Sequence, residues 1–220
     1  MEYRIECRHR NTYQKTCRIS LLFFFLSIFN YQLSIVNAQT PNERQAREFF
    51  DKTWELVFGE QGCSFRYDVN IIGLYKTSGT IWQKGKKSKY QSSRSQSWNN
   101  GTDCYVVRKK EVTIYRSDDP ERDKHASRFQ FERDNYKYNI ANDKEGLLLT
   151  LKAKSSRVKG VSEVKVLVDR HTFAPIRLRV KVSIVHATVR ITNFKSDNIS
   201  DDIFEFPAQQ FKNLKVVDKR

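Results

Sequence analysis

Alternation between apolar and polar residues from Ile176 to Phe194 constrains the fold of this chain more than any other feature of its sequence. The pattern slips at Val185 and then resumes, and Arg177, Arg179 and Lys181 stand at its polar positions. Its apolar positions are Ile176, Leu178, Val180, Val182, Ile184, Ala187, Val189 and Ile191. Because successive side chains of a strand point to opposite faces, the pattern predicts a sheet with one apolar face and one cationic, solvated face. The apolar face must be covered, either by protein or by a ligand.

The first 38 residues are expected to be a secretory signal peptide that does not belong to the fold. Basic residues precede the apolar run Ile19–Ile28, and Val36-Asn37-Ala38 fits the small-residue cleavage rule. The run is shorter than the ~20 apolar residues that cross a bilayer, which favours cleavage over an uncleaved membrane anchor. No cysteine follows the run where lipid attachment would need one. We therefore expect residues 39–220 to form a single domain that is exported and soluble.

The chain is strongly basic, which bears on its partners. Its formal net charge of +15 falls to +12 when residues 1–38, with five basic and two acidic residues, are removed. Such a surface favours anionic partners such as lipid headgroups or acidic proteins. Nucleic acid is not expected outside the cytoplasm. The alternative is that the cations only solvate the outer face of the sheet, because they alternate along strands instead of clustering.

Two cysteines remain beyond the leader, Cys63 and Cys104. An oxidising compartment permits a disulfide between them. The alternative is a pair of buried thiols, since unpaired cysteine packs as a small hydrophobe. Zinc is not expected, because two isolated cysteines without a nearby histidine cannot fill four tetrahedral positions.

Residues 42–58 are predicted to form an amphipathic helix, capped by Thr40 or Asn42 and followed by Gly59. Its apolar stripe at spacings of three and four consists of Ala46, Phe49, Phe50, Thr53, Trp54 and Val57. A second, short helix is predicted between Ser117 and Phe129. The stripe indicates packing on a sheet, and its aromatic character is compatible with lining a pocket.

The rest of the chain reads as about nine or ten short strands joined by turns, which favours an antiparallel meander. The expected strands include those around Phe65–Val69, Thr77–Lys84, Lys87–Ser93, Tyr105–Val107, Val112–Tyr115, Tyr136–Ile140, Leu147–Leu151 and Val164–Val168, and a short edge strand at Phe204–Phe206. One helix covers only part of such a sheet, so a cavity is expected between them.

Patterns typical of catalysis are absent from the sequence. It contains neither a glycine-rich phosphate loop nor a nucleophile elbow. His125, His171 and His186 are scattered, and the acidic pairs Asp118-Asp119 and Asp201-Asp202 lie in polar loops. We therefore expect a protein that is not an enzyme and has no catalytic residues, cofactor or metal.

The order of several short motifs after the first helix resembles a known family. The motifs are Gly79-Thr80-Ile81-Trp82-Gln83-Lys84, Trp98-x-x-Gly101 before Cys104-Tyr105-Val106, a hairpin centred on Asp169, Ile191-Thr192-Asn193-Phe194, Asp202-x-Phe204-x-Phe206-Pro207 and Val216-Val217-Asp218-x-Arg220. In this order they resemble the outer-membrane lipoprotein carrier family, LolA. The resemblance covers essentially the whole chain beyond residue 38.

The resemblance implies a mainly β (α+β) fold, a curved, half-open antiparallel β-barrel with the N-terminal helix and a short second helix in its mouth. It also implies a monomeric carrier that shields lipoprotein acyl chains between the two membranes. Its partners would be an inner-membrane lipoprotein-releasing transporter and an outer-membrane receptor. The residues expected to line the acyl-chain cavity are Phe50, Trp54, Phe65, Trp82, Tyr105 and Leu149. The alternative is a periplasmic sensor or regulatory module that binds lipid or protein on the same fold.

Overall fold

The computed structural model describes residues 39–71, 75–119, 132–155, 160–182, 185–196 and 198–220. The compact unit spans Thr40–Arg220, and the other unit, Met1–Gln39, contains the predicted signal peptide, which lies outside the described residues. No helix among the described residues is both long and apolar enough to cross a membrane.

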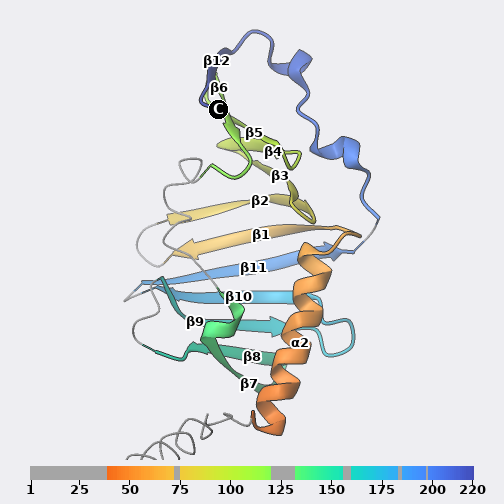
Figure 1. Ribbon diagram of the computed structural model, residues 1–220, viewed down its shortest axis with the longest axis vertical. Coiled ribbons are helices and arrows are strands. Elements are labelled where there is room, and N and C mark those ends of the chain that lie inside the picture. Colours follow the sequence, from red (N-terminus) through yellow and green to blue (C-terminus); the bar gives the residue numbers. More distant parts are fainter. Residues whose placement is uncertain (1–38, 72–74, 120–131, 156–159, 183–184, 197) are drawn as a thin grey trace, which may run out of the picture. The chain divides into compact units, whose positions relative to one another are not determined.

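The compact unit is built around one sheet, to which twelve strands of the described residues belong (Figure 1). They are β1 Cys63–Ile71, β2 Tyr75–Lys84, β3 Lys87–Ser92, β4 Ser95–Asn99, β5 Asp103–Arg108, β6 Glu111–Arg116, β7 Tyr136–Asp143, β8 Gly146–Ala153, β9 Val161–Val168, β10 Pro175–Val182, β11 Val185–Lys195 and β12 Lys215–Asp218. Their spatial order is β12-β6-β5-β4-β3-β2-β1-β11-β10-β9-β8-β7. Two antiparallel meanders, β1–β6 and β7–β11, therefore join where β1 pairs with β11.

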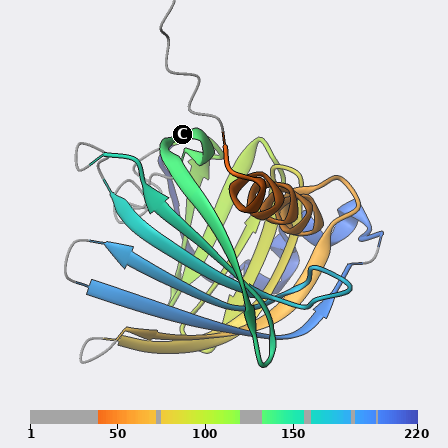
Figure 2. The same ribbon diagram turned by 90° about the horizontal axis from the view of Figure 1, so that it is seen from below.

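The sheet is curved and does not close, and α2 (Pro41–Phe58) lies inside the curve (Figure 2). We call the face that α2 covers the concave face and the opposite one the convex face. The predicted fold class is confirmed: a mainly β protein with a curved, half-open antiparallel sheet, an N-terminal helix and a short helix. A 3-10 helix at Arg133–Asn135 leads into β7, whereas most of the short helix predicted over 117–129 lies outside the described residues.

The segment Ile176–Phe194 forms two antiparallel strands, β10 and β11, and the slip at Val185 marks where the second strand begins. One prediction on the strands is wrong. The short strand predicted at Phe204–Phe206 is instead a 3-10 helix, Asp201–Phe204, followed by irregular chain. The edge strand at this end of the sheet is β12, which pairs in parallel with β6.

Helix α2 begins as the sequence predicts. The Thr40 hydroxyl accepts a hydrogen bond from the Glu43 backbone N–H at 3.1 Å, which satisfies one amide of the first turn. Asn42 exchanges two hydrogen bonds with the backbone of Ile140 at 2.9 and 3.1 Å. Because Ile140 belongs to the edge strand β7, Asn42 occupies pairing groups that an open edge would offer to another chain.

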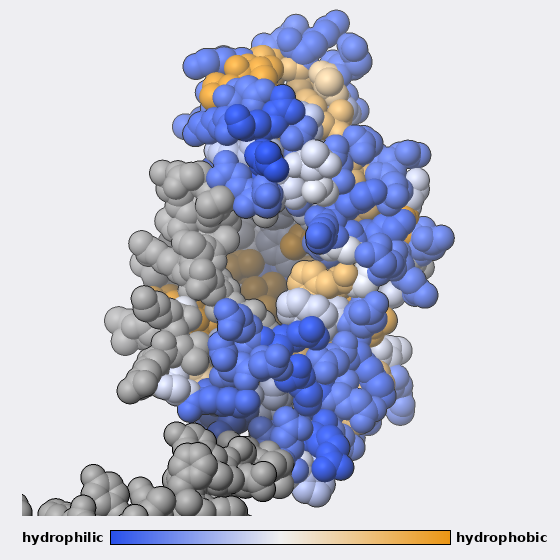
Figure 3. All heavy atoms as spheres, in the orientation of Figure 1, coloured by the Kyte–Doolittle hydropathy of each residue, from blue (hydrophilic) through white to orange (hydrophobic). Residues whose placement is uncertain are grey.

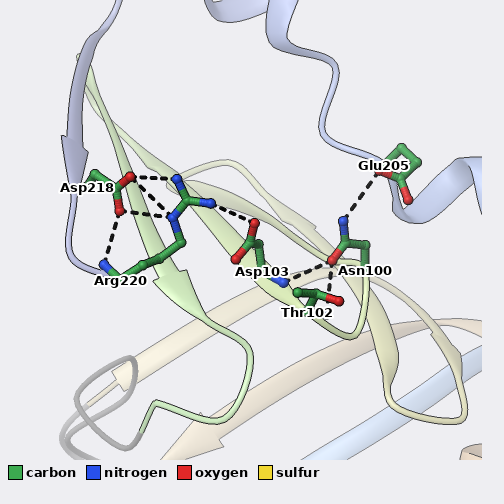
Figure 4. A network of polar contacts seen from close by, with 6 residues as sticks. All are labelled: Asn100, Thr102, Asp103, Glu205, Asp218 and Arg220. Atoms are coloured by element: carbon green, nitrogen blue, oxygen red, sulfur yellow. Dashed lines mark hydrogen bonds and ion pairs between the residues drawn. The ribbon is translucent and has the colours of Figure 1, made fainter.

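The last residues of the chain fasten β12 to the neighbouring strands (Figure 4). One terminal nitrogen of Arg220 donates to the Asp103 carboxylate at 2.8 Å, and the other donates to Asp218 at 2.6 Å. The Arg220 guanidinium lowers the pKa of Asp218 to about 2, since it favours the charged carboxylate. The side chain of Asn100 donates to Glu205 at 3.4 Å, so a loop of the sheet also contacts the C-terminal segment.

Candidate functional site

The part of the concave face that lies under α2 is sealed. Phe50 and Ala46 of the helix are buried against Leu149, which is 0 % exposed. The ring of Phe50 lies 5.7 Å from that of Tyr138. Burial of this kind removes apolar surface from water and stabilises the fold by ~25 cal/mol per Å². This end of the face is therefore ordinary protein core.

Charged groups hold the helix in this position. Arg47 pairs with Asp134 at 2.9 Å, and Arg133 pairs with Asp51 of the helix at 3.0 Å. The Arg47 guanidinium also lies 5.1 Å from the ring centre of Tyr138. Burial raises the pKa of Tyr138 to about 12, so its phenol stays neutral at physiological pH. These contacts join α2 to the β7 end of the sheet.

Beyond the helix, the middle of the concave face is apolar but only partly covered. The strand register places the alternating residues of β10, β11, β1, β2 and β3 on this face, and many are half-buried, not buried. We define the central strip by seven of them: Val69, Ile81, Tyr90, Leu178, Val180, Val189 and Ile191. Figure 3 shows a hollow with an apolar floor on this side of the molecule.

A glycine beside the central strip makes room for an aromatic ring. Gly79 of β2 lies opposite Tyr67, and a Cβ atom added at Gly79 would come within 2.6 Å of the Tyr67 hydroxyl oxygen. The Tyr67 ring can therefore lie across β2 and stack on Tyr90, with ring centres 5.7 Å apart. Any larger residue at position 79 would displace this ring.

The concave face becomes polar at the far end of the sheet. Ser97, Asn99 and Thr113 point to this side on β4 and β6. Trp98, Val107 and Val112 of β4, β5 and β6 point to the convex face instead, where they are buried. Phe206, Phe211 and Leu214 of the C-terminal segment cover them. The central strip thus ends where the sheet changes its apolar face.

The six residues predicted for the cavity divide between the two faces. Phe50 and Leu149 belong to the core under α2, with Trp54 packed against it, and Phe65 is buried in the adjoining cluster on the same face. The other two are convex. The Lys89 ammonium lies 5.0 Å from the ring centre of Trp82, and Tyr105 stacks on Phe206 with ring centres 4.5 Å apart. The structure therefore brings four of the six to the concave face, and their role in binding stays a prediction.

The sequence did not predict the central strip as a binding surface. Its signal was present, because Leu178, Val180, Val189 and Ile191 belong to the alternating pattern. That pattern identifies a face but does not tell which part of the face a helix leaves uncovered.

Of the two alternatives for the cysteines, the disulfide is wrong, because Cys63 and Cys104 are buried thiols that are not joined. They lie in one row across β1 to β5, with three strands between them. Neighbouring strands lie about 4.8 Å apart, so this separation far exceeds the Cα distance of a disulfide. The Cys63 thiol donates to the Val57 carbonyl at 3.5 Å, and burial raises its pKa to about 12. Such a thiol is unreactive at neutral pH.

Within the described ranges, no group of three or more His, Cys, Asp or Glu side chains is placed to hold a metal ion.

Comparison with known proteins shows the fold. No family model matches the chain, and no curated protein matches it in sequence. An uncharacterized conserved protein from Thermus thermophilus superposes with a TM-score of 0.55 at 11% identity, over 80% of this chain and 99% of that one. MucB superposes with a TM-score of 0.52 at 11% identity, over 81% of this chain and 67% of that one.

A LolA superfamily protein from Nitrosomonas europaea is also among the matches. It superposes with a TM-score of 0.39 at 11% identity, over 73% of this chain and 97% of that one. The matches thus include a member of the superfamily that the sequence was expected to resemble.

Proposed function

We propose that this protein is a periplasmic carrier that shields the acyl chains of lipoproteins on the central strip of its concave face. The observation that carries the proposal is the half-buried state of the strip: its residues are apolar, and α2 seals only the neighbouring part of the face. Transfer of apolar surface out of water stabilises a complex by ~0.8 kcal/mol per methylene. An acyl chain is therefore a ligand of matching chemistry.

Partial cover also suits a protein that must release its cargo. A fully closed core would leave no site, whereas a fully exposed strip of this kind would favour aggregation. An acyl chain that binds on the central strip competes for its surface only with water and with side chains that are already half-buried. In this proposal residues 1–38 direct export and are removed. A transporter of the inner membrane loads the carrier, and a receptor of the outer membrane unloads it.

Two matched variants test the site. Ile191→Glu places a carboxylate on the central strip, and Thr192→Glu places the same group one residue away on the convex face. The protein is expressed with its leader, purified gently, and examined by native mass spectrometry and lipid extraction. We expect bound lipid in the unmodified protein and in Thr192→Glu, and a loss of at least tenfold in Ile191→Glu, since burying a carboxylate against acyl chains is costly.

The identity of the bound molecule separates the carrier from a sensor. A lipid-modified polypeptide that remains bound after incubation supports the carrier. Tightly held free lipid and no bound lipopeptide would contradict lipoprotein transport and favour a lipid-sensing module. Equal lipid content in both glutamate variants would show that the central strip is not the site.

A further inference from the structure

The convex face of β10, β11 and β1 carries cations that have few ion-pair partners among the described residues. Five of them lie close together across these strands: Arg66, Arg177, Arg179, Lys181 and Arg190. We call this set the cationic wall. Figure 2 shows β10 and β11 as part of the curved sheet, with their outer side turned away from α2. The acyl-chain site proposed above lies on the opposite face, so the two proposals stand or fail separately.

Charge compensation within the cationic wall is poor. Arg177 pairs with Glu145 at 3.3 Å. No ion pair of Arg66, Arg179, Lys181 or Arg190 is found in the part of the chain that the structure describes. Asp68 stands opposite Arg190 in the strand register but is not within ion-pair distance of it.

Strand pairing makes this charge locally unfavourable. Arg177 lies directly opposite Arg190 on the neighbouring strand, and Arg177, Arg179 and Lys181 follow one another on the same face of β10. Like charges placed opposite each other across a sheet destabilise it. A position that breaks a local rule without compensation within the fold is often functional, because its partner is outside the fold.

We propose that the cationic wall docks the protein on the surface of a bilayer that contains anionic phospholipids. Arginine and lysine match phosphate headgroups in charge, and guanidinium groups bind phosphate oxygens in pairs. The residues lie on the outside of a curved sheet, with Arg66, Arg179 and Arg190 exposed, so a broad surface can reach several of them at once. Contact with headgroups would relieve the repulsion between Arg177 and Arg190.

Vesicle binding by the whole protein tests the inference. The variant replaces three cations of the cationic wall, Arg179→Gln, Lys181→Gln and Arg190→Gln. Its matched control replaces three cations outside the cationic wall, Lys86→Gln in the β2–β3 turn, Lys110→Gln in the β5–β6 turn and Lys212→Gln in the C-terminal segment, so both proteins lose the same net charge. Binding is measured by co-sedimentation with phosphatidylcholine vesicles, with and without one third phosphatidylglycerol, at low and at high salt.

We expect binding only to the anionic vesicles and only at low salt, because surface charges are screened at high ionic strength. Each cation near an anionic bilayer strengthens binding about fivefold. The wall variant should therefore bind on the order of 100-fold more weakly, and the control should lose less than tenfold. Loss of repulsion should leave the thermal midpoint of the wall variant unchanged or raised, which separates weakened docking from misfolding.

Three outcomes would overturn the proposal. One is failure of the unmodified protein to bind anionic vesicles, and another is an equal loss in the two triple variants. The third is retention on immobilised polyglutamate without vesicle binding, which would assign the cationic wall to an acidic protein.

Discussion

The two ends of the sheet bury opposite faces. α2 crosses the concave face from β7 to β1 and covers the part beneath it, where the core includes Leu149 and Tyr138. At the β4–β6 end, the C-terminal segment covers the convex face, where Trp98 and Val107 are buried. Beside α2 the concave face of β10, β11, β1, β2 and β3 stays apolar but half-buried. The central strip is therefore the apolar part of this face that α2 leaves half-buried, and the C-terminal segment covers the opposite face instead.

The largest effect is expected at the centre of the convex core. Trp98 is 4 % exposed and packs edge-on against Phe206 and Phe211 at 5.5 Å. Trp98→Ala should lower the free energy of unfolding by about 3–5 kcal/mol in urea titrations. Trp82→Ala is the control, because Trp82 lies on the same face but is only half-buried. Similar losses in both variants would mean that the C-terminal segment is not the cover.

The concave core at the other end should respond almost as strongly. Leu149→Ala removes a fully buried side chain under α2 and should cost about 2–5 kcal/mol of unfolding free energy. Leu148→Ala changes the next residue, which is half-buried on the convex face, and should cost less than half as much. A larger loss at Leu148 would reverse the assignment of faces at this end.

On β5, in contrast to β8, a substitution on the convex face should cost more unfolding free energy than one on the concave face. Val107→Ala, on the convex face, should cost about 2 kcal/mol, since it removes two buried carbons and leaves a small cavity. Val106→Ala, on the half-buried concave side, should cost clearly less. Together with the leucine pair on β8, these variants test the exchange of faces directly. If the concave residue were the costlier one on both strands, the sheet would have a single apolar face.

The smallest effect concerns pH and the fastening of β12. The pKa of Asp218 is about 2 in the folded protein, below its ordinary value of 3.8. Its carboxylate therefore contributes stability that is present above about pH 4 and is lost as the pH falls toward 2. Asp218→Asn should unfold slightly more easily than the unmodified protein at pH 6, and the difference should vanish near pH 2. Arg220→Gln should show the same convergence, and a constant offset in either variant would contradict the pairing.

Much of the fold follows from patterns with a simple physical cause. The helical stripe of Ala46, Phe50 and Thr53 is the buried side of α2, and Thr40 is its cap. Most strand predictions fall on real strands, because alternation of apolar and polar residues indicates a strand that is buried on one face. The register of β1 with β11, and the parallel pairing of β12 with β6, depend on contacts between distant segments that a local pattern does not contain.

The candidate site was harder to predict for the same reason. Trp82 and Tyr105 look like cavity residues because they are aromatic and belong to strands. Their face is decided by pairing through Lys89 and Trp98, and it proves to be the convex one. Ile191 and Val189 carried the right periodicity, but the extent of the helical cover decides which apolar positions stay half-buried.

The central claim is that an acyl chain binds on the central strip of the concave face. The most direct measurement is methyl nuclear Overhauser spectroscopy on isotope-labelled protein with a saturating long-chain fatty acid. We expect contacts from the acyl methylenes to methyl groups of Val69, Val189 and Ile191, with none to Val107 or Val112. Contacts to Val107 or Val112 instead, or saturation without contacts to the central strip, would contradict it.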